Sequence, residues 1–277
     1  MSGFSIDWLN LREAADRRAR DAGLLNRAKH WLESAVAAGS EAAVVDLGAG
    51  TGATLRAFST PADTMRLSST WRLVDHDAEL LAEAIHRHGD ANRLETFAQD
   101  LTDIIALPLT GAHLVTASAL FDLVSAEFLD TFAHELWRQC WQQPVGLYSA
   151  LNYDGTTRWT PTHALDDAVL DAFNRDQRRD KGFGPALGPD AGQYLERLFT
   201  KLGFSVFSAN SPWALKGDDQ LLIQTLIDGI GGAVAQDPSL DAASLEEWIQ
   251  FRRAHALTGS CIVGHLDLLA LPEVAAW

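Results

Sequence analysis

The sequence predicts an α/β fold in which a sheet of mainly parallel strands carries helices on both faces. Short apolar runs alternate with segments of helical period from about residue 42 to residue 151. A glycine-rich loop follows the first apolar run, which is typical of the first strand-to-helix turn in such a fold. The chain has 277 residues, enough for one large domain of this class with additions.

A helical segment is expected before the sheet. Apolar side chains recur at helical spacing from about residue 4 to residue 38, and Asp7 is placed to cap the first helix. We therefore divide the chain into an N-terminal helical segment, 1–40, and a main domain, 41–277.

Five apolar runs are expected to form the parallel strands, because strands buried on both faces read as nearly continuous apolar stretches. These runs are 42–47, 71–74, 93–98, 112–117 and 145–151. Helices are expected between them at 51–58, 77–88 and 122–141.

The pattern loosens after the fifth run. Residues 152–161 are expected to form a polar loop, followed by a helical insertion at about 163–202 and a sixth strand at 204–208. A second helical insertion is expected at about 218–257. The last run, 261–269, is predicted to be an antiparallel strand at the edge of the sheet.

The composition favours a cytoplasmic protein that binds small molecules. The formal net charge of -15 disfavours nucleic acid and anionic membranes as partners. The two cysteines, Cys140 and Cys261, belong to no Cys/His cluster, so neither a metal site nor a disulfide framework is indicated. The chain contains no long apolar run that suggests a membrane span or a signal peptide. Either a monomer or a homodimer fits.

The glycine-rich loop is the main chemical signal. Asp46 stands two residues before Gly48, and Gly50 and Gly52 follow at alternate positions. Glycines let the backbone turn tightly and let a ligand approach without a Cβ in the way. The same glycines also fit a dinucleotide fingerprint, Gly48-x-Gly50-x-x-Ala53. A carboxylate at Asp46 would repel a pyrophosphate, and it suits a ligand with cationic groups.

Residues 44–52, Val-Val-Asp-Leu-Gly-Ala-Gly-Thr-Gly, resemble the first motif of the class I S-adenosylmethionine-dependent methyltransferases without a gap. The resemblance covers about 42–152 and implies a Rossmann-like, doubly wound mixed sheet of seven strands in the order 3-2-1-4-5-7-6. It also implies S-adenosylmethionine as the cofactor, S-adenosylhomocysteine as the product, and the N-terminal helical segment as a cover for the cofactor.

The resemblance implies cofactor contacts after each of the first four strands. Asp75 would accept the ribose hydroxyls, while the alternative acid, Asp77, fits a helix cap better. The other expected contacts are the loop residues Asp46, Gly48, Ala49, Gly50 and Gly52, then His76, Asp100, Leu101, Ser118, Ala119 and Leu120, and Arg12, with Arg20 as an alternative, for the carboxylate of the methionine part.

Candidate substrate residues follow the later strands: Phe121, Asn152, Tyr153, Trp159 and Trp213. Turn chemistry explains Asn152 equally well, and a tryptophan such as Trp213 is more often core. Asp122, Tyr153 and His163 are candidates for a general base, although Asp122 also fits a helix cap and His163 a helix start.

The predicted function is methyl transfer to a small molecule by direct displacement, driven mainly by positioning. No Asn-Pro-Pro-Tyr motif follows the fourth strand; in the family that motif accompanies amino methylation of nucleic-acid bases or glutamine. Two alternatives remain: a non-catalytic cofactor-binding protein with this fold, and a nicotinamide-dependent oxidoreductase.

Overall fold

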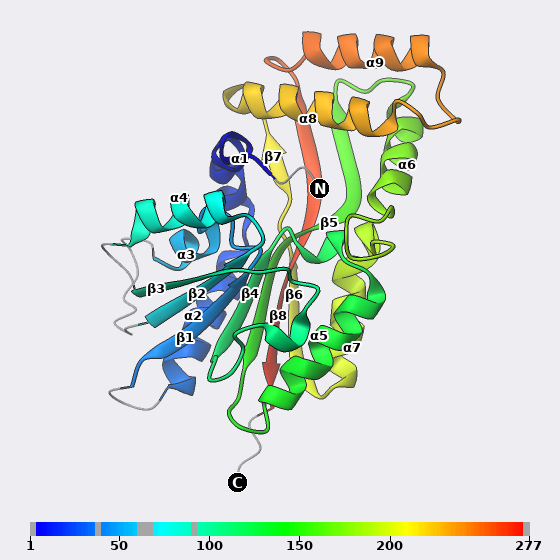
Figure 1. Ribbon diagram of the computed structural model, residues 1–277. Helices are drawn as coiled ribbons and strands as arrows, with labels where there is room; N and C mark the ends of the chain where they lie inside the picture. The colour runs from blue at the N-terminus through cyan, green and yellow to red at the C-terminus, as the bar shows by residue number, and fades with distance from the viewer. Residues whose placement is uncertain (1–3, 37–39, 60–68, 90–92, 274–277) are drawn as a thin grey trace.

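The central sheet has the strand order that the family resemblance implied. A computed structural model describes residues 4–36, 40–59, 69–89 and 93–273. The strands are ordered β3-β2-β1-β4-β5-β8-β6, and a short strand, β7, pairs with β8 (Figure 1). Their bounds are β1 Ala42–Leu47, β2 Ser69–Asp75, β3 Arg93–Ala98, β4 Leu114–Ser118, β5 Gly146–Thr160, β6 Phe204–Asn210, β7 Trp213–Leu215 and β8 Ser260–Pro272.

The separate prediction that the last strand lies at the edge of the sheet is wrong. β8 is antiparallel to β5 and β6, as expected, but it lies between them and not at the sheet edge. The edge position falls to β6. Burial explains the difference, because Leu268, Leu269 and Ala270 are fully buried, as an interior strand requires.

Helices cover both faces of the sheet, as expected. One face carries α2 (Ala22–Ala35), α3 (Ala53–Phe58) and α4 (Ala78–His88), and the other carries α5 (Ala126–Gln139) and α7 (Ala191–Lys201) (Figure 1). Neighbouring residues of β1 belong to different hydrophobic clusters: Val44 packs with the first group of helices and Val45 with the second. This alternation is the pleat of a strand that is buried on both sides.

The N-terminal segment forms two helices, α1 (Ile6–Ala19) and α2. Ser5, and not Asp7, caps α1, because its Oγ accepts the amide hydrogen of Trp8 at 3.1 Å. Helix α1 ends at Arg20, and Asp21 caps α2. The outer ends of the predicted 1–40 segment, 1–3 and 37–39, lie outside the described residues.

The predicted polar loop at 152–161 is instead the second half of β5. This half pairs with β8, for example through Tyr153↔His265 and Trp159↔Cys261. The register shifts twice, once between Ser149 and Asn152 and once between Tyr153 and Thr157. Asn, Asp, Gly and Thr residues made the segment read as a loop. Pairing with a strand more than 100 residues away decides its conformation, and no local pattern reports such pairing.

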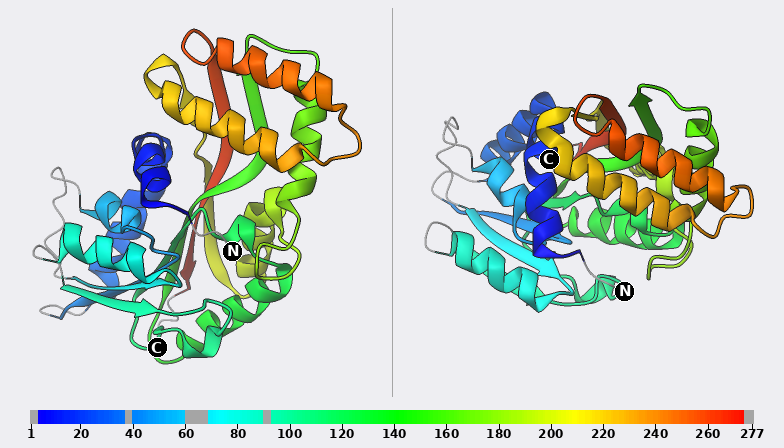
Figure 2. Two further views of the ribbon diagram at one scale, coloured as in Figure 1. Left: turned by 45° about the horizontal axis from the view of Figure 1, so that its top comes forward. Right: turned by 90° about the horizontal axis from the view of Figure 1, so that it is seen from above.

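A helical layer, which we call the cap, packs on the extensions of β5 and β8. It consists of α6 (Asp166–Gln177), α8 (Gln220–Val234) and α9 (Ala242–Ala254), and it lies beyond one end of the sheet (Figures 1 and 2). A third hydrophobic cluster joins these helices to β5, β7 and β8 and includes Trp213, Trp248 and Cys261. Both predicted helical insertions contribute to the cap.

The segment after β4 also differs from the prediction. Residues Phe121–Leu123 form a 3-10 turn, and the following helix, α5, begins only at Ala126. Ser125 caps this helix by accepting the amide hydrogen of Phe128 at 3.2 Å. Asp122 therefore has no capping role, and its carboxylate is available for other contacts.

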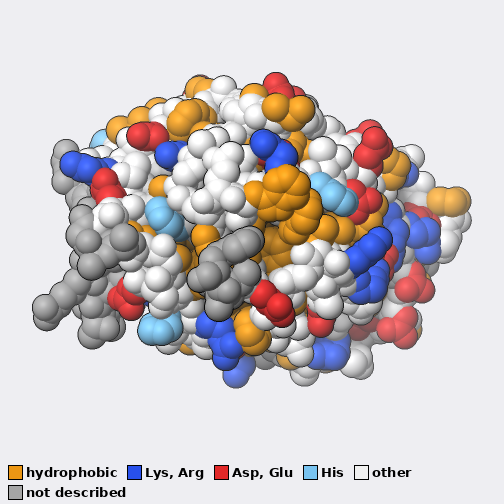
Figure 3. All heavy atoms as spheres, turned by 90° about the horizontal axis from the view of Figure 1, so that it is seen from below, with side chains coloured by type: hydrophobic (Ala, Val, Ile, Leu, Met, Phe, Trp, Pro, Cys, Tyr) orange, Lys and Arg blue, Asp and Glu red, His pale blue; other side chains and the backbone are white. Residues whose placement is uncertain are grey.

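The face of the molecule seen from below carries hydrophobic side chains near its middle, with acidic and basic side chains interspersed around them (Figure 3). At the end of α5, the Trp141 side chain is 73% exposed and packs edge-on against Trp137. None of the helices within the described ranges is long and apolar enough to cross a membrane.

Candidate functional site

The glycine loop and the acid after β2 are joined directly. Gly48, Gly50 and Gly52 have φ values of +62°, +53° and +83°, which side-chain-bearing residues rarely adopt. The amide of Gly50 donates to Asp75 Oδ2 at 2.8 Å, and the amide of Asp77 donates to Asp75 Oδ1 at 3.0 Å. Asp77 itself caps α4. Asp75 therefore fixes the loop and stands at the carboxyl edge of the sheet.

Helix α1 lies across this loop. A Cβ placed on Gly50 would come within 3.1 Å of Leu9 Cδ1, and one on Gly48 would come within 3.4 Å of Leu120 Cδ1. The loop is thus narrow between α1 on one side and the segment after β4 on the other. Only glycine fits there without displacing a neighbour.

Polar contacts fasten α1 in this position. Arg56 of α3 donates to both carboxylate oxygens of Glu13, with Nη2 at 2.8 Å from Oε2. On the cap side, Trp213 Nε1 donates to Asp16 Oδ1 at 2.9 Å, and Arg18 pairs with Asp219 at 2.6 Å. Helix α1 therefore bridges the glycine loop and the cap.

Asp46 carries an unpaired acceptor. Its side chain is buried at the end of β1, where Oδ1 accepts from Thr116 Oγ1 at 2.7 Å. Oδ2 has no hydrogen-bond partner within the described part of the chain. Burial raises the pKa of Asp46 to about 7, although the hydrogen bond from Thr116, the charge of Arg20 and the nearby Thr54 hydroxyl act in the opposite direction. A cationic donor at Oδ2 would satisfy the carboxylate.

Arg20 carries an unpaired donor in the same region. It is more than nine-tenths buried, and its Nη2 donates to Ser118 Oγ at 2.8 Å. Its Nη1 has no partner of hydrogen-bond geometry among the residues described, and the hydroxyl of Tyr148, which also has none, lies close enough to help raise the pKa of Arg20. Arg12, the arginine expected at this place, is instead bound to Asp16 through Nε at 2.9 Å. The structure therefore places Arg20, not Arg12, beside Ser118.

The segment after β4 has a constrained backbone. Ala119 has a φ of +50°, which is unfavourable for a residue with a Cβ, and its amide donates to the carbonyl of Ala150 at 2.9 Å. Such conformations occur most often at ligand sites. The turn brings Ser118 to Arg20 and Leu120 to Gly48.

The residues that were predicted to contact the adenine lie near Asp75. His76 Nδ1 lies 3.3 Å from Asp75 Oδ1, and the imidazole also lies close enough to Asp100 to affect its titration. Asp100 is exposed, and hydrogen bonds from the Thr102 amide and hydroxyl lower its pKa. Leu101 is buried beside it. The three acids after β1, β2 and β3 thus share one edge of the sheet.

A second group of polar and aromatic side chains lies between α1 and the extended strands. We call it the Asp122–His265 cluster, and its members are Trp8, Arg12, Asp122, Tyr153, Trp213 and His265. Tyr153 pairs with His265 across β5 and β8, and Trp213 pairs with Val263, two residues before His265. Residues paired in this way point to one face of a sheet.

Electrostatics within this cluster are unusual. Burial raises the pKa of Asp122 to about 6, whereas the amides of Asp122 and Tyr153 and the charge of Arg12 lower it. Burial, and then the charge of Arg12, lowers the pKa of His265 to about 3. Asp122 Oδ1 and His265 Nδ1 have no hydrogen-bond partner among the described side chains and backbone. His265 was not foreseen from the sequence, where it is one polar residue inside an apolar strand.

Three other predicted residues have structural contacts. Asn152 is buried in the sheet and donates to Ser149 Oγ and to the carbonyl of Leu266. Phe121 is core and packs against Phe132. His163 precedes α6 and contacts Phe251 of α9. These contacts explain the residues by packing and turn formation.

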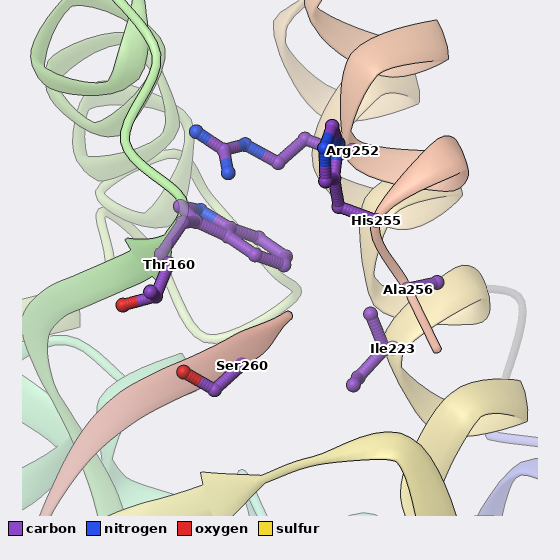
Figure 4. Close-up of a pocket in the computed structure, with 7 residues that line it drawn as sticks. Thr160, Ile223, Arg252, His255, Ala256 and Ser260 are labelled. Carbon is purple, nitrogen blue, oxygen red and sulfur yellow. The ribbon is translucent and has the colours of Figure 1, made fainter. Parts of the chain in front are cut away.

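Trp159 belongs to the cap. It lines a cavity of about 10 Å³ together with Thr160, Ile223, Arg252, His255, Ala256 and Ser260 (Figure 4). Such a space accommodates about one water molecule. The Arg252 guanidinium lies 5.1 Å from the centre of the Trp159 ring. Across the described ranges, no group of three or more His, Cys, Asp and Glu residues is arranged to hold a metal ion.

Known structures resemble this one in outline. A cyclopropane synthase, MmaA2, from Mycobacterium tuberculosis is 11% identical with a TM-score of 0.48, and the match covers 96% of this chain and 94% of that one. A cyclopropane-fatty-acyl-phospholipid synthase-like protein from Lactobacillus casei is 12% identical with a TM-score of 0.46, over 94% and 98%. The plantazolicin methyltransferase BpumL, solved with S-adenosylhomocysteine, is 11% identical with a TM-score of 0.42, over 96% and 88%.

No family model and no curated protein matches the sequence. At these identities and TM-scores, the structural similarity assigns neither a ligand nor a site residue to this chain.

Proposed function

We propose that this protein binds S-adenosylmethionine and transfers its methyl group to a small molecule. One observation carries the proposal. Beside the glycine loop, Asp46 offers a buried acceptor and Arg20 a buried donor, both without partners in the described part of the chain. An α-amino acid has an ammonium group that can donate to Asp46 and a carboxylate that can accept from Arg20. The methionine part of the cofactor is such a group.

The other residues fit the rest of the cofactor. Asp75 stands after β2, where its carboxylate can accept the ribose hydroxyls while it holds the amide of Gly50. His76, Asp100 and Leu101 flank the adenine in this arrangement. Gly48 and Gly50 have no Cβ where the methionine part would approach the loop, and the side chains of Leu9 and Leu120 lie directly over them.

Helix α1 acts as the cover of the site in this proposal. Leu9 lies against the loop, and the contacts of Glu13 and Asp16 hold the helix to α3 and to β7. Closure of such a helix excludes water from the reacting groups. The 1–40 segment is therefore a functional part of the protein and not only a structural addition.

Bound S-adenosylmethionine supplies a methyl group that is already activated for displacement. The protein's tasks are to align an acceptor with that group, to keep water out, and to remove a proton where the acceptor carries one. The acidic net charge of -15 favours a small acceptor over a nucleic acid.

The rival functions fit the site less well. A nicotinamide dinucleotide would bring its pyrophosphate towards the carboxylate of Asp46, and the charges would repel each other. A non-catalytic cofactor-binding protein would have the same loop, and a turnover assay with a library of small acceptors distinguishes it from an enzyme.

The proposal is tested by binding of S-adenosylhomocysteine and of 5′-methylthioadenosine, which lacks the amino acid part. Arg20→Gln should weaken S-adenosylhomocysteine binding by about tenfold to a hundredfold, because it removes a charged hydrogen bond. It should leave 5′-methylthioadenosine binding unchanged. Isothermal titration calorimetry measures both.

The matched control is Arg17→Gln, an exposed arginine on the same helix. It should leave both dissociation constants unchanged. Absence of S-adenosylhomocysteine binding to the unmodified protein would reject the proposal, and so would equal losses for both ligands in Arg20→Gln with a normal Arg17→Gln.

A further inference from the structure

The Asp122–His265 cluster contains buried polar atoms that the proposed cofactor does not use. Asp122 Oδ1, His265 Nδ1 and Trp8 Nε1 are all buried and all without a hydrogen-bond partner in the described ranges. Asp122 and His265 are each more than nine-tenths buried. Folded proteins rarely leave buried polar atoms unpaired, so several in one cluster indicate a ligand that pairs with them.

The atoms have a defined hydrogen-bonding polarity. Asp122 offers a carboxylate oxygen, which accepts. Burial and the charge of Arg12 favour the neutral form of the His265 ring, in which one nitrogen donates and the other accepts. Trp8 Nε1 can only donate. The complementary ligand therefore has a donor for Asp122, an acceptor for Trp8 and, for His265, a hydroxyl or amine group that can pair with Nδ1 in either tautomer.

Aromatic rings and the Arg12 guanidinium surround these atoms. The rings of Trp213 and Tyr153 lie 5.1 Å and 6.4 Å from that of His265, measured between centroids. Arg12 lies 5.2 Å from the Trp213 ring and 6.0 Å from the Trp8 ring. Its charge is already bound to Asp16, so the cluster favours a planar, uncharged ligand over an anion.

We propose that the Asp122–His265 cluster is the acceptor subsite and that it takes an aromatic acceptor with two hydroxyl or amine groups. This inference rests on the proposed function. One group donates to Asp122 Oδ1 and the other pairs with His265 Nδ1. An oxygen of the ligand accepts from Trp8 Nε1. Asp122 is then a catalytic residue, and His265 and Trp8 select the acceptor.

The chemical step balances with these residues. The oxygen or nitrogen of the acceptor forms a bond to the methyl carbon, while the carbon–sulfur bond breaks and its electron pair stays on sulfur. The proton of the attacking group moves to Asp122 Oδ1. Burial raises the pKa of Asp122 to about 6, which makes it a stronger base than an ordinary carboxylate, and because this value still lies below 7 most of the carboxyl is ionised at neutral pH.

The test compares two probes that share a 3,4-dioxygenated toluene ring, in the presence of S-adenosylhomocysteine. The probe 4-methylcatechol has both donor groups, and 3,4-dimethoxytoluene has neither. Calorimetry should show at least about tenfold tighter binding of the catechol to the unmodified protein. Asp122→Leu and His265→Phe should each weaken catechol binding by about tenfold and leave binding of the dimethoxy probe and of S-adenosylhomocysteine unchanged.

The control variant is His163→Phe, the same change at a histidine outside the cluster, and it should bind both probes normally. The comparison of probes on the unmodified protein needs no variant and remains valid if one fails to fold. If S-adenosylhomocysteine binds while the catechol binds no better than the dimethoxy probe, or not at all, the inference is overturned and the proposed function stands. If S-adenosylhomocysteine does not bind, the proposed function fails first.

Discussion

Asp46 shows how one residue changes its meaning between sequence and structure. In the sequence it separates the loop from a dinucleotide fingerprint. In the structure it is a buried carboxyl with one unpaired oxygen and a pKa raised to about 7 by burial. Since this pKa lies above the ordinary value of 3.8, the group contributes stability at low pH that is lost as pH rises through 7. A cationic partner at Oδ2 would stabilise the ionised carboxylate and so lower its pKa.

Binding of S-adenosylhomocysteine is therefore expected to release a proton from Asp46. At pH 6 most of the free protein carries this proton, and the ligand's ammonium lowers the pKa of Asp46. Affinity should rise as pH increases from 5 to 7, by up to about tenfold per pH unit, and level off above the pKa of the free carboxyl. Calorimetry at pH 6 in buffers of different ionisation enthalpy measures the proton count. Asp46→Asn should bind without release; equal release from this variant would contradict the assignment.

At the scale of elements, α1 connects the loop to the cap through side chains at both of its flanks. The sequence placed a helix here, and the structure adds what holds it: Glu13 to Arg56, Asp16 to Trp213, and Arg18 to Asp219. The two ion pairs, Glu13–Arg56 and Arg18–Asp219, are partly exposed, so each contributes on the order of 0.5–1 kcal/mol, whereas the hydrogen bond between Asp16 and Trp213 is buried. The helix is therefore held firmly enough to cover a ligand and weakly enough to open.

Glu13→Gln should loosen α1 without unfolding the protein. Because the pair with Arg56 is partly exposed, we expect a twofold to fivefold faster dissociation of S-adenosylhomocysteine and faster amide hydrogen exchange in α1. Stopped-flow displacement and exchange mass spectrometry measure the two effects. Asp7→Asn, at an exposed position of the same helix, is the control. Unchanged exchange in Glu13→Gln would show that the ion pair does not hold the helix.

At the scale of the whole molecule, β5 and β8 connect the cap to the sheet, because both strands extend through the two layers. Both strands begin or end in the sheet and continue under α6, α8 and α9. Arg252 anchors α9 to this extension: it pairs with Asp166 at the start of α6 and donates to the carbonyl of Pro161 at 2.6 Å. Loss of these contacts should lower the stability of the whole protein and not only that of the cap.

Arg252→Gln should lower the free energy of unfolding by roughly 3 kcal/mol, because it leaves Asp166 without its buried partner. Unfolding in urea should remain a single transition, since the two strands pass through both layers. Arg253→Gln is the matched control, one residue along α9, where both partners of the ion pair are exposed. Its effect should stay below about 0.5 kcal/mol. A separate early transition in Arg252→Gln would show that the cap unfolds independently.

Much of the architecture was predictable because it depends on local patterns. Apolar runs gave the strands, helical spacing gave the helices, and the loop from Asp46 to Gly52 gave the position of the candidate site. The second half of β5 was not predictable. Its polar residues read as a loop, and only pairing with β8 makes them a strand. The interior position of β8 depends on the same distant pairing.

The sequence by itself determined the α/β class and the glycine loop with the acids near the ends of the first three strands, because these follow from residue type and spacing along the chain. The strand order was implied by the family resemblance of residues 44–52. The tertiary structure alone decided that Arg20 lies beside Ser118, that Arg12 is bound to Asp16, and that His265 lies beside Tyr153. These contacts join residues through packing across the sheet, and unpaired buried atoms exist only once the chain has folded around them.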